Sequence, residues 1–196
     1  MSLFIHAEFY RTVHRDADLP PDHGAELAFA GRSNAGKSSV LNALLNRRRL
    51  ARVSKTPGRT QAINFYSLGS QRYLVDLPGY GYAAVGRSQR EFWGKLISSY
   101  LMHRAGLRGL FLICDARRSL QDLDHQLLEW FSPTGKPVHV LLTKADKLSR
   151  AQMETALVRT RDWLSATSPG VSVQLFSSVT QEGVVAARKV MTYWMQ

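Results

Sequence analysis

The segment GRSNAGKSS, residues 31–39, is the feature of the sequence that most constrains the fold. Gly31 is followed, after four residues, by Gly36-Lys37-Ser38, which fits the pattern G-x-x-x-x-G-K-[ST]. The apolar run before it (26–30) has the composition of a buried strand, and the segment after it (37–46) has apolar residues at helical spacing. A glycine loop in this position lets main-chain N–H groups turn inward around phosphate oxygens at the positive end of a helix dipole. The pattern therefore predicts a phosphate-binding loop in an α/β domain.

Each part of this loop has an expected role. Lys37 is placed to reach the β- and γ-phosphates of a nucleotide, and the Ser38 hydroxyl offers the hard oxygen ligand that Mg²⁺ favours. The rest of the cradle consists of Gly31, Arg32, Ser33, Asn34, Ala35 and Gly36. The alternative is an ordinary glycine-rich turn without a ligand, and the strand and helix on either side argue against it.

The remaining chain alternates between predicted strands and helices. Strand-like apolar runs occupy 63–68, 72–77, 109–116, 137–143 and 171–177. The first two flank Gly69-Ser70, which predicts a hairpin. Helical spacing of apolar residues marks 90–104, 121–131, 151–164 and 184–195. We therefore expect a three-layer α/β fold with a mostly parallel six-stranded sheet, one antiparallel strand and helices on both faces, and a ligand at the carboxyl ends of the strands.

Length and composition favour one domain. With 196 residues, of which 44% are apolar, the chain can bury a full core, whereas two domains would be cramped. Residues 1–25 precede the first predicted strand and form an N-terminal extension, partly extended and partly loose. Residues 26–196 then form a single domain, which we expect to be a monomer. The helix 151–164 is predicted to begin with a capping box, because Ser149 precedes Gln152 by three residues.

Cysteine content and hydropathy bear on the compartment. Cys114 is the only cysteine, so no disulfide can form within the monomer, and a reducing compartment with a buried, inert thiol is expected. No segment approaches the roughly 20 apolar residues of a membrane helix, and the first residues lack the pattern of a signal peptide. These features predict a cytoplasmic protein without membrane insertion.

The net charge of +11 indicates a polyanionic partner, with RNA and anionic lipid as the usual choices. The cations occur in small groups, such as the run NRRR at 46–49, rather than in a basic tail. A merely well-solvated surface is the alternative, because charge alone does not identify a ligand. A membrane-surface role ranks lowest, since no long basic amphipathic helix is evident.

Two further motifs bear on which nucleotide is bound. Asp76-Leu77-Pro78-Gly79 ends a predicted strand, which places Asp76 beside the Mg²⁺, acting through water, and the Gly79 amide near a γ-phosphate. Alone, this tetrapeptide is also a good turn. Thr143-Lys144-Ala145-Asp146 follows another strand. The Asp146 carboxylate can accept hydrogen bonds from both N1 and N2 of guanine, a donor pair that adenine lacks. The order of these motifs predicts GTP rather than ATP, with main-chain amides of Phe176, Ser177 and Ser178 available to guanine O6.

The set GRSNAGKSS, TPGRTQAINFY, DLPGYGYA, TKADKL and FSS resembles the EngB family of bacterial GTPases, in the translation-factor-like branch of P-loop GTPases. The resemblance spans residues 5 to 195. It implies a Ras-like GTP-binding fold, hydrolysis of GTP to GDP with Mg²⁺, and a switch role in assembly of the large ribosomal subunit. The partner would be that subunit or its precursor, through ribosomal RNA and proteins. The family is also associated with normal cell division and septation.

The resemblance also implies a first switch segment. By position it comprises Gly58, Arg59, Thr60, Gln61 and Ala62. Thr60 matches a threonine that ligates Mg²⁺ only when the γ-phosphate is present, so Ser38 and Thr60 are the expected metal ligands. Thr56 is the competitor, but a proline follows it and stiffens the loop, whereas Thr60 directly precedes the strand.

The hydrolytic machinery is less complete than in Ras. There a glutamine orients the attacking water, and the matching position here, directly after Gly79, is Tyr80, whose phenol cannot act as that amide does. We therefore expect slow hydrolysis, roughly under one turnover per minute, until ribosomal contact or a monovalent cation completes the site. Asn34 is the candidate to hold K⁺, which adds it to Lys37 and Thr60 as a candidate catalytic residue. The alternative is that Asn34 merely suits the turn.

The glycines at 79–86 suggest a mobile second switch, in which exposed Tyr80 and Tyr82 are able to stack on RNA bases or to contact a protein. The alternative is a simple surface loop. Two other classes of protein remain open at this point. A P-loop nucleotide kinase would share residues 31–38 but would not need Asp146. A scaffold that binds GTP without turnover is compatible with Tyr80.

Overall fold

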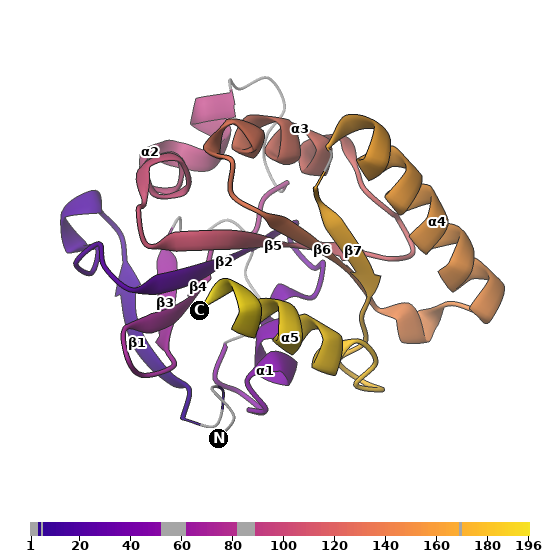
Figure 1. Cartoon of the computed structure of the whole chain (residues 1–196), viewed down its shortest axis with the longest axis horizontal. Helices are drawn as coiled ribbons and strands as arrows, with labels where there is room; N and C mark the ends of the chain where they lie inside the picture. Colours follow the sequence, from indigo (N-terminus) through magenta and orange to yellow (C-terminus); the bar gives the residue numbers. More distant parts are fainter. Residues whose placement is uncertain (1–3, 5, 52–61, 82–88, 169) are drawn as a thin grey trace.

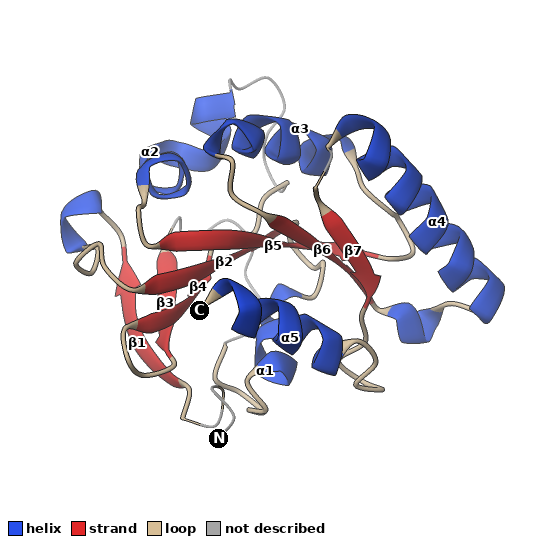
Figure 2. Ribbon diagram, viewed as in Figure 1, coloured by secondary structure: helices blue, strands red, loops and turns tan. Residues whose placement is uncertain are grey.

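The computed structural model describes residues 4, 6–51, 62–81, 89–168 and 170–196, and it has three layers. A twisted sheet lies in the middle, with α2, α3 and α4 on one face and α1 and α5 on the other (Figures 1 and 2). The strands are β1 (Glu8–Val13), β2 (Ala25–Gly31), β3 (Ile63–Ser67), β4 (Arg72–Asp76), β5 (Leu107–Asp115), β6 (Val138–Thr143) and β7 (Ser172–Leu175). The α-helices are α1 (Lys37–Leu44), α2 (Gln89–His103), α3 (Asp122–Phe131), α4 (Arg150–Thr167) and α5 (Val184–Trp194). The three-layer α/β prediction is confirmed.

The sheet has seven strands in the order β1-β3-β4-β2-β5-β6-β7, one more than predicted. The additional strand is β1, which pairs antiparallel with β3 through registers such as Val13↔Ile63 and lies at the edge of the sheet. Only Val13 of its six residues is buried, so the apolar pattern of a half-buried strand is missing there. β3 runs antiparallel to both of its neighbours, and the other pairs are parallel, as expected for a sheet with one antiparallel strand.

The central strands are buried on both faces, which explains their continuous apolar runs. Phe29 of β2 stacks on Phe111 of β5, with ring centroids 4.9 Å apart, in the core under α1 and α5. Their neighbours Ala28 and Leu110 point to the opposite core, under α2 and α3. Packing on both faces holds β2 and β5 in place, so the positions at which their following loops begin are fixed.

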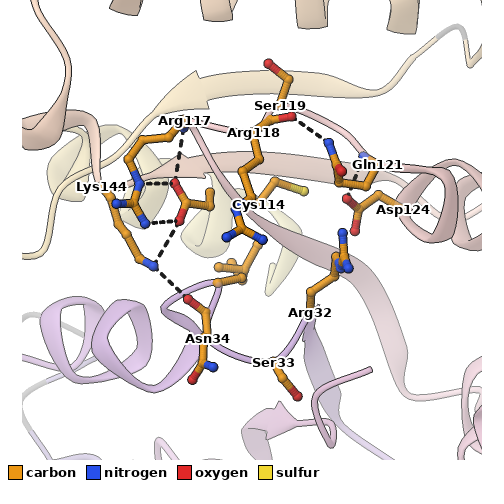
Figure 3. A pocket seen from close by; sticks show the side chains of 13 residues that line it. Arg32, Ser33, Asn34, Cys114, Arg117, Arg118, Ser119, Gln121, Asp124 and Lys144 are labelled. Carbon is orange, nitrogen blue, oxygen red and sulfur yellow. Dashed lines mark hydrogen bonds and ion pairs between the residues drawn. The ribbon is translucent and has the colours of Figure 1, made fainter. Parts of the chain in front are cut away.

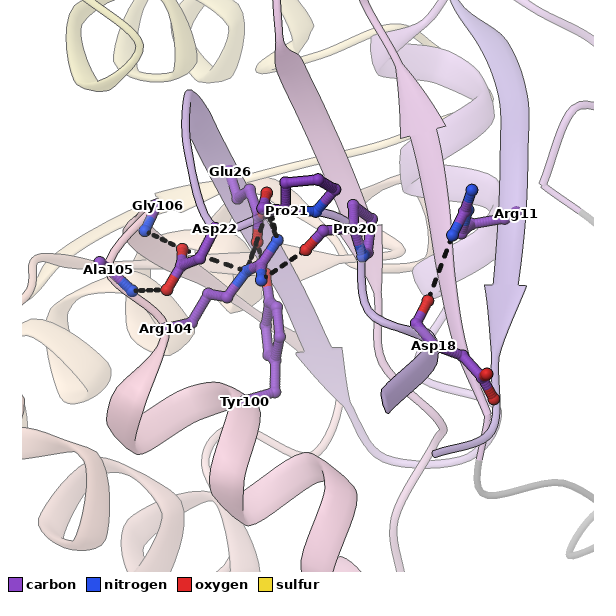
Figure 4. Close-up of polar contacts among 10 residues, drawn as sticks. All are labelled: Arg11, Asp18, Pro20, Pro21, Asp22, Glu26, Tyr100, Arg104, Ala105 and Gly106. Atoms are coloured by element: carbon purple, nitrogen blue, oxygen red, sulfur yellow. Dashed lines mark hydrogen bonds and ion pairs between the residues drawn. The ribbon is translucent and has the colours of Figure 1, made fainter. Parts of the chain in front are cut away.

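A buried polar network joins the segment before β2 to the end of α2 (Figure 4). Glu26, with no exposed surface, accepts hydrogen bonds from the Tyr100 hydroxyl (2.8 Å) and from the Arg104 guanidinium (2.6 Å). Arg104 also donates to the main-chain oxygens of Pro20 (2.9 Å) and Pro21 (3.3 Å). Because every charge in the network has a partner, its burial is tolerated.

The carboxyl ends of β2, β4, β5, β6 and β7 meet at one edge of the sheet, where a ligand of an open α/β sheet is expected. All predicted nucleotide motifs within the described ranges follow these strand ends. Among the helices of those ranges, none is both long enough and apolar enough to cross a membrane.

Candidate nucleotide site

The loop after β2 has the backbone geometry that the sequence predicts. A Cβ atom at Gly31 would lie 2.6 Å from the Ile113 main-chain oxygen, so only glycine allows β2 and β5 to approach this closely. Gly36 has φ = +100° and is the N-cap of α1, and no side chain of the described residues caps this helix start. The first N–H groups of α1 therefore face outward as a ready-made anion site.

Lys37 and Asp76 form an ion pair at the base of this loop. Lys37 is the first residue of α1 and Asp76 the last residue of β4, and their side chains are only 12% and 8% exposed. The pairing of β2 with β4, in which Phe29 lies opposite Asp76, holds the carboxylate at this level of the sheet. A buried cation and a hard oxygen donor are thus held side by side, where phosphate and a metal ion would be needed.

The phosphate loop is tied to the segment after β6. The Thr143 hydroxyl lies 2.5 Å from the Ala35 main-chain oxygen and 3.0 Å from that of Cys114. Lys144, at φ = +60°, donates from Nζ to the Asn34 main-chain oxygen at 2.7 Å. Two of the predicted guanine-motif residues therefore hold the phosphate loop in place, a positioning role that the sequence did not predict.

Asp115, at the end of β5, binds Lys144 from the other side and also binds Arg117. Its carboxylate accepts from Lys144 Nζ at 2.9 Å and from the Arg117 guanidinium at 2.7 and 2.9 Å. Burial alone would raise the pKa of Asp115, but the hydrogen bonds from Arg117 and Lys144 outweigh it and hold the pKa well below its ordinary value. Sequence reasoning missed Asp115, although its place at the end of a predicted strand was a usable signal.

Asp146 is held in one orientation by the loop after β7. The Ser177 hydroxyl donates to Asp146 Oδ1 at 2.6 Å, and Lys147 lies 3.3 Å from Oδ2. The Ser177 hydroxyl in turn accepts from the N–H groups of Val179 and Thr180 at 3.2 and 3.1 Å. The hydrogen bond from Ser177 lowers the pKa of Asp146, so the carboxylate is ionised at neutral pH and able to accept hydrogen bonds from a base.

The three residues after β7 have different roles. The Phe176 N–H donates to the Leu142 oxygen (2.8 Å) and the Ser177 N–H to the Glu182 oxygen (3.0 Å), so both amides are used within the fold. Phe176 also accepts from the Ala145 N–H at 3.2 Å, which fixes this loop to the guanine motif. The contact of Ser178 with guanine O6 stays a prediction.

A cavity of about 180 Å³ opens between the phosphate loop and the loop after β5. Arg32 and Arg118 extend toward it from its two sides, and the Cys114 thiol lies between them (Figure 3). Cys114 is buried, and burial raises the pKa of its thiol, as expected for an inert cysteine. Lys37, Ser38 and Asp146 are not among its lining residues, so this cavity adjoins the phosphate cradle rather than forming it.

Tyr80 is placed differently from the prediction of an exposed side chain. It is 5% exposed, and its hydroxyl donates to Asp124 of α3 at 2.5 Å. Burial and the nearby carboxylate raise the pKa of Tyr80 well above its ordinary value. The expectation that Tyr80 stacks on RNA is therefore wrong, because α3 covers the ring. Tyr82 lies outside the described residues.

The first switch falls almost entirely outside the described residues. This applies to Thr56, Gly58, Arg59, Thr60 and Gln61, whose roles stay predictions. Ala62 is described and is buried directly before β3. In the second motif Leu77 is buried and its N–H donates to the Phe29 main-chain oxygen at 3.0 Å, whereas Gly79 is exposed.

The donor set fits Mg²⁺. The Ser38 hydroxyl, in the first turn of α1, is a hard oxygen of the kind that this ion prefers, and the Asp76 carboxylate, beside Lys37, is a second oxygen that can act through water. Among the described residues no group of three or more His, Cys, Asp or Glu side chains forms a metal cage. Mg²⁺ at nucleotide sites is held by one or two protein oxygens together with substrate phosphates, so it does not need such a cage.

Comparison with known proteins agrees with this geometry. Residues 26–144 match the family model described as "50S ribosome-binding GTPase". The "Probable GTP-binding protein EngB" of Nitrosomonas europaea is 56% identical over 192 residues, which cover 98% of this chain and 86% of the relative. That of Methylobacillus flagellatus is 53% identical over 195 residues, covering 100% and 94%.

Two solved structures share the fold. The crystal structure of a probable GTP-binding protein engB has a TM-score of 0.64 at 20% identity, covering 87% of this chain and 98% of that one. Era in complex with MgGDPNP and a segment of 16S ribosomal RNA has a TM-score of 0.63 at 20% identity, covering 88% and 57%.

A phosphate loop, an aspartate at a neighbouring strand end and a guanine motif that meet at one sheet edge define a P-loop GTPase, which hydrolyses GTP. The chain belongs to the EngB family of GTP-binding proteins. This membership argues against the nucleotide-kinase alternative.

Proposed function

We propose that this GTPase is a slow molecular switch in assembly of the large ribosomal subunit, and that through this role it supports normal cell division and septation. The observation that carries the GTP-dependent part is that the segment after β6, which holds Asp146, is hydrogen-bonded to the phosphate loop through Lys144 Nζ and the Asn34 main-chain oxygen. The ribosomal part is supported by the family description and by the net charge of +11. We further propose a cytoplasmic monomer in which residues 26–196 act as one GTP-binding unit.

In this proposal the residues of the chain bind and orient the nucleotide. Asp146, oriented by Ser177, accepts from N1 and N2 of guanine. Main-chain N–H groups at the start of α1 surround the phosphates, and Lys37 moves its ammonium from Asp76 toward the β- and γ-phosphates. The exposed Gly79 amide faces the γ-phosphate.

The metal has a defined place in this scheme. Ser38 and Thr60 would hold Mg²⁺, with Asp76 acting through water, and the ion when bound neutralises charge on the β- and γ-phosphates. Tyr80 is occupied by Asp124, so it does not orient an attacking water as a glutamine would. This supports slow hydrolysis by the isolated protein, with a partner or a cation supplying what is missing.

Co-sedimentation with ribosomal subunits and their precursors tests the proposal. We expect the protein bound to a non-hydrolysable GTP analogue to sediment with large subunits or their precursors, and the GDP-bound protein to sediment less. Single-turnover hydrolysis should accelerate when those particles are added. Equal sedimentation in both nucleotide states would contradict the switch.

Potassium dependence tests the role of Asn34. Its main-chain oxygen accepts from Lys144 while its side-chain amide points away from that contact, and the residue is exposed (Figure 3). We expect hydrolysis to be about tenfold faster in KCl than in NaCl, a small part of what an arginine finger supplies. Asn34 has φ = +66°, so Asn34→Gly keeps the turn and should remove the difference. Equal rates of the wild type in the two salts would leave Asn34 as a turn residue only.

A basic surface formed by the loop after α1 and by α5 is the expected RNA contact. Arg47, Arg48 and Arg49 are exposed. Arg188 of α5 donates to the Leu44 oxygen at 2.9 Å, which joins α5 to the end of α1, and α5 also carries the exposed Lys189. RNA phosphates that bind here would release counterions, so affinity should fall as salt rises.

A triple substitution tests this surface. Replacing Arg47, Arg48 and Arg49 by Ala should weaken binding to large-subunit precursors and reduce the slope of log affinity against log salt by about 2 to 3. The matched control replaces three exposed arginines of α4, which lies elsewhere on the molecule: Arg150, Arg159 and Arg161. If both triple variants lost affinity equally, net charge rather than this surface would explain the binding.

A further inference from the structure

The main chain of Tyr80 is bound directly to the phosphate loop. The Tyr80 oxygen accepts from the Ser33 N–H at 2.9 Å, and the Tyr80 N–H donates to the Gly31 oxygen at 3.3 Å. Gly79 immediately precedes this contact, and a Cβ atom on Gly79 would lie 3.2 Å from the Ser33 hydroxyl. The place of the Gly79 amide therefore depends on where Tyr80 is held.

The side chain of Tyr80 is held by a residue that is itself fixed. Its hydroxyl donates to Asp124 Oδ1 at 2.5 Å, and Asp124 is 1% exposed. The other oxygen of Asp124 accepts from the Gln121 N–H at 2.9 Å, as part of the capping box that begins α3. The start of α3 thus anchors the Tyr80 ring. The ring cannot leave its position without breaking a buried hydrogen bond.

We propose that Tyr80 is a positioning residue, which uses its hydrogen bond to Asp124 to hold the Gly79 amide at the phosphate loop for the γ-phosphate of GTP. This inference rests on the proposed placement of the γ-phosphate at Gly79. In this proposal Tyr80, which occupies the position of the Ras glutamine, positions the site and takes no part in the chemical step. The side chain reaches α3 and touches no reacting atom, while the main chain beside it sets the geometry of the site.

The contact predicts a selective effect on binding. GDP lacks the γ-phosphate that Gly79 would meet, so loss of the anchor should weaken GTP binding and leave GDP binding nearly unchanged. A general loss of stability would weaken the binding of both nucleotides equally. The ratio of the two affinities therefore separates a positioning role from a structural role.

Tyr80→Phe removes the hydroxyl and keeps the ring. The matched control is Tyr100→Phe, which removes another buried phenol–carboxylate hydrogen bond, to Glu26 at 2.8 Å, in the network shown in Figure 4. Affinities for GDP and for a non-hydrolysable GTP analogue would be measured by fluorescence titration of the full chain, together with thermal unfolding. We expect Tyr80→Phe to lower the affinity for the analogue about tenfold and the affinity for GDP less than about twofold. Tyr100→Phe should lower the unfolding temperature without changing the ratio.

Asp124→Asn tests the same contact with Tyr80 in place. Its amide oxygen is a weaker, neutral acceptor, so analogue affinity should fall in the same sense and by a smaller factor, even if Tyr80→Phe folds poorly. Combining the two substitutions should add little to Tyr80→Phe alone. An unchanged affinity ratio in Tyr80→Phe and Asp124→Asn, or an equal change in Tyr100→Phe, would overturn the inference. Failure of the wild type to bind the GTP analogue would instead contradict the proposed function.

Discussion

Lys37→Met is expected to lower the affinity for both GTP and GDP by about 10²- to 10⁴-fold. The ammonium of Lys37 would contact oxygens of two phosphates, and charge-assisted hydrogen bonds contribute about 1.5–3 kcal/mol each. Methionine has a similar length and no charge, so the volume at the start of α1 is kept. Isothermal titration with each nucleotide gives the measurement.

The structure adds a second consequence for this variant. Lys37 pairs with Asp76, whose side chain is 8% exposed, so the substitution leaves a nearly buried carboxylate without its cation. Thermal unfolding without nucleotide should therefore also shift downward. Lys189→Met, at an exposed position of α5, is the matched control and should leave nucleotide affinity unchanged. A Lys37→Met protein with normal affinity would exclude the loop as the phosphate site.

Asp146→Asn is expected to reduce GTP affinity by about 10²- to 10⁴-fold, because two hydrogen bonds to a charged acceptor, of about 1.5–3 kcal/mol each, are lost or replaced. An asparagine accepts from N1 through its oxygen and offers an N–H where guanine N2 also has one. Xanthine carries an oxygen at that position. The variant should therefore bind xanthosine triphosphate in preference to GTP, which competition against a fluorescent nucleotide would measure.

The control for this substitution is Asp162→Asn, on the exposed face of α4. It removes the same charge from the molecule and should change neither affinity nor base preference. Since hydrogen bonding from Ser177 lowers the pKa of Asp146, the carboxylate is ionised at pH 7 and the comparison measures the wild-type anion. If Asp146→Asn lowered GTP affinity without any gain for xanthosine triphosphate, the carboxylate would not be the group that reads the base.

Local patterns in the sequence were enough to predict most of the fold. Apolar periodicity located the α-helices of the described residues and every strand of the sheet except β1 within a few residues. The predicted Ser149–Gln152 capping box is also present. β1 was not predicted, because an edge strand with one buried residue lacks the alternation that identifies a strand. β1 pairs with β3 across about 50 residues of sequence, and local sequence patterns do not identify such a distant partner strand.

The candidate site was predictable where the residue types and spacing of a short motif indicate its chemistry. The phosphate loop, Asp76 and Asp146 were predicted to lie at one sheet edge because each follows a predicted strand of a mostly parallel sheet. The residues that orient them were not, because Thr143, Lys144 and Asp124 act through contacts with distant segments. Tyr80 shows the limit: glycines around an aromatic residue favour exposure, yet the ring is part of a buried core and its hydroxyl binds Asp124, 44 residues later.

The contacts of Thr143 and Lys144 with the phosphate loop have a mechanical consequence. The two ends of a bound nucleotide would rest on parts of the protein that share hydrogen bonds, so a disturbance at the base is transmitted to the phosphates without passing through the ligand. A factor that accelerates GDP release would then need to pull on only one of these segments to loosen the other.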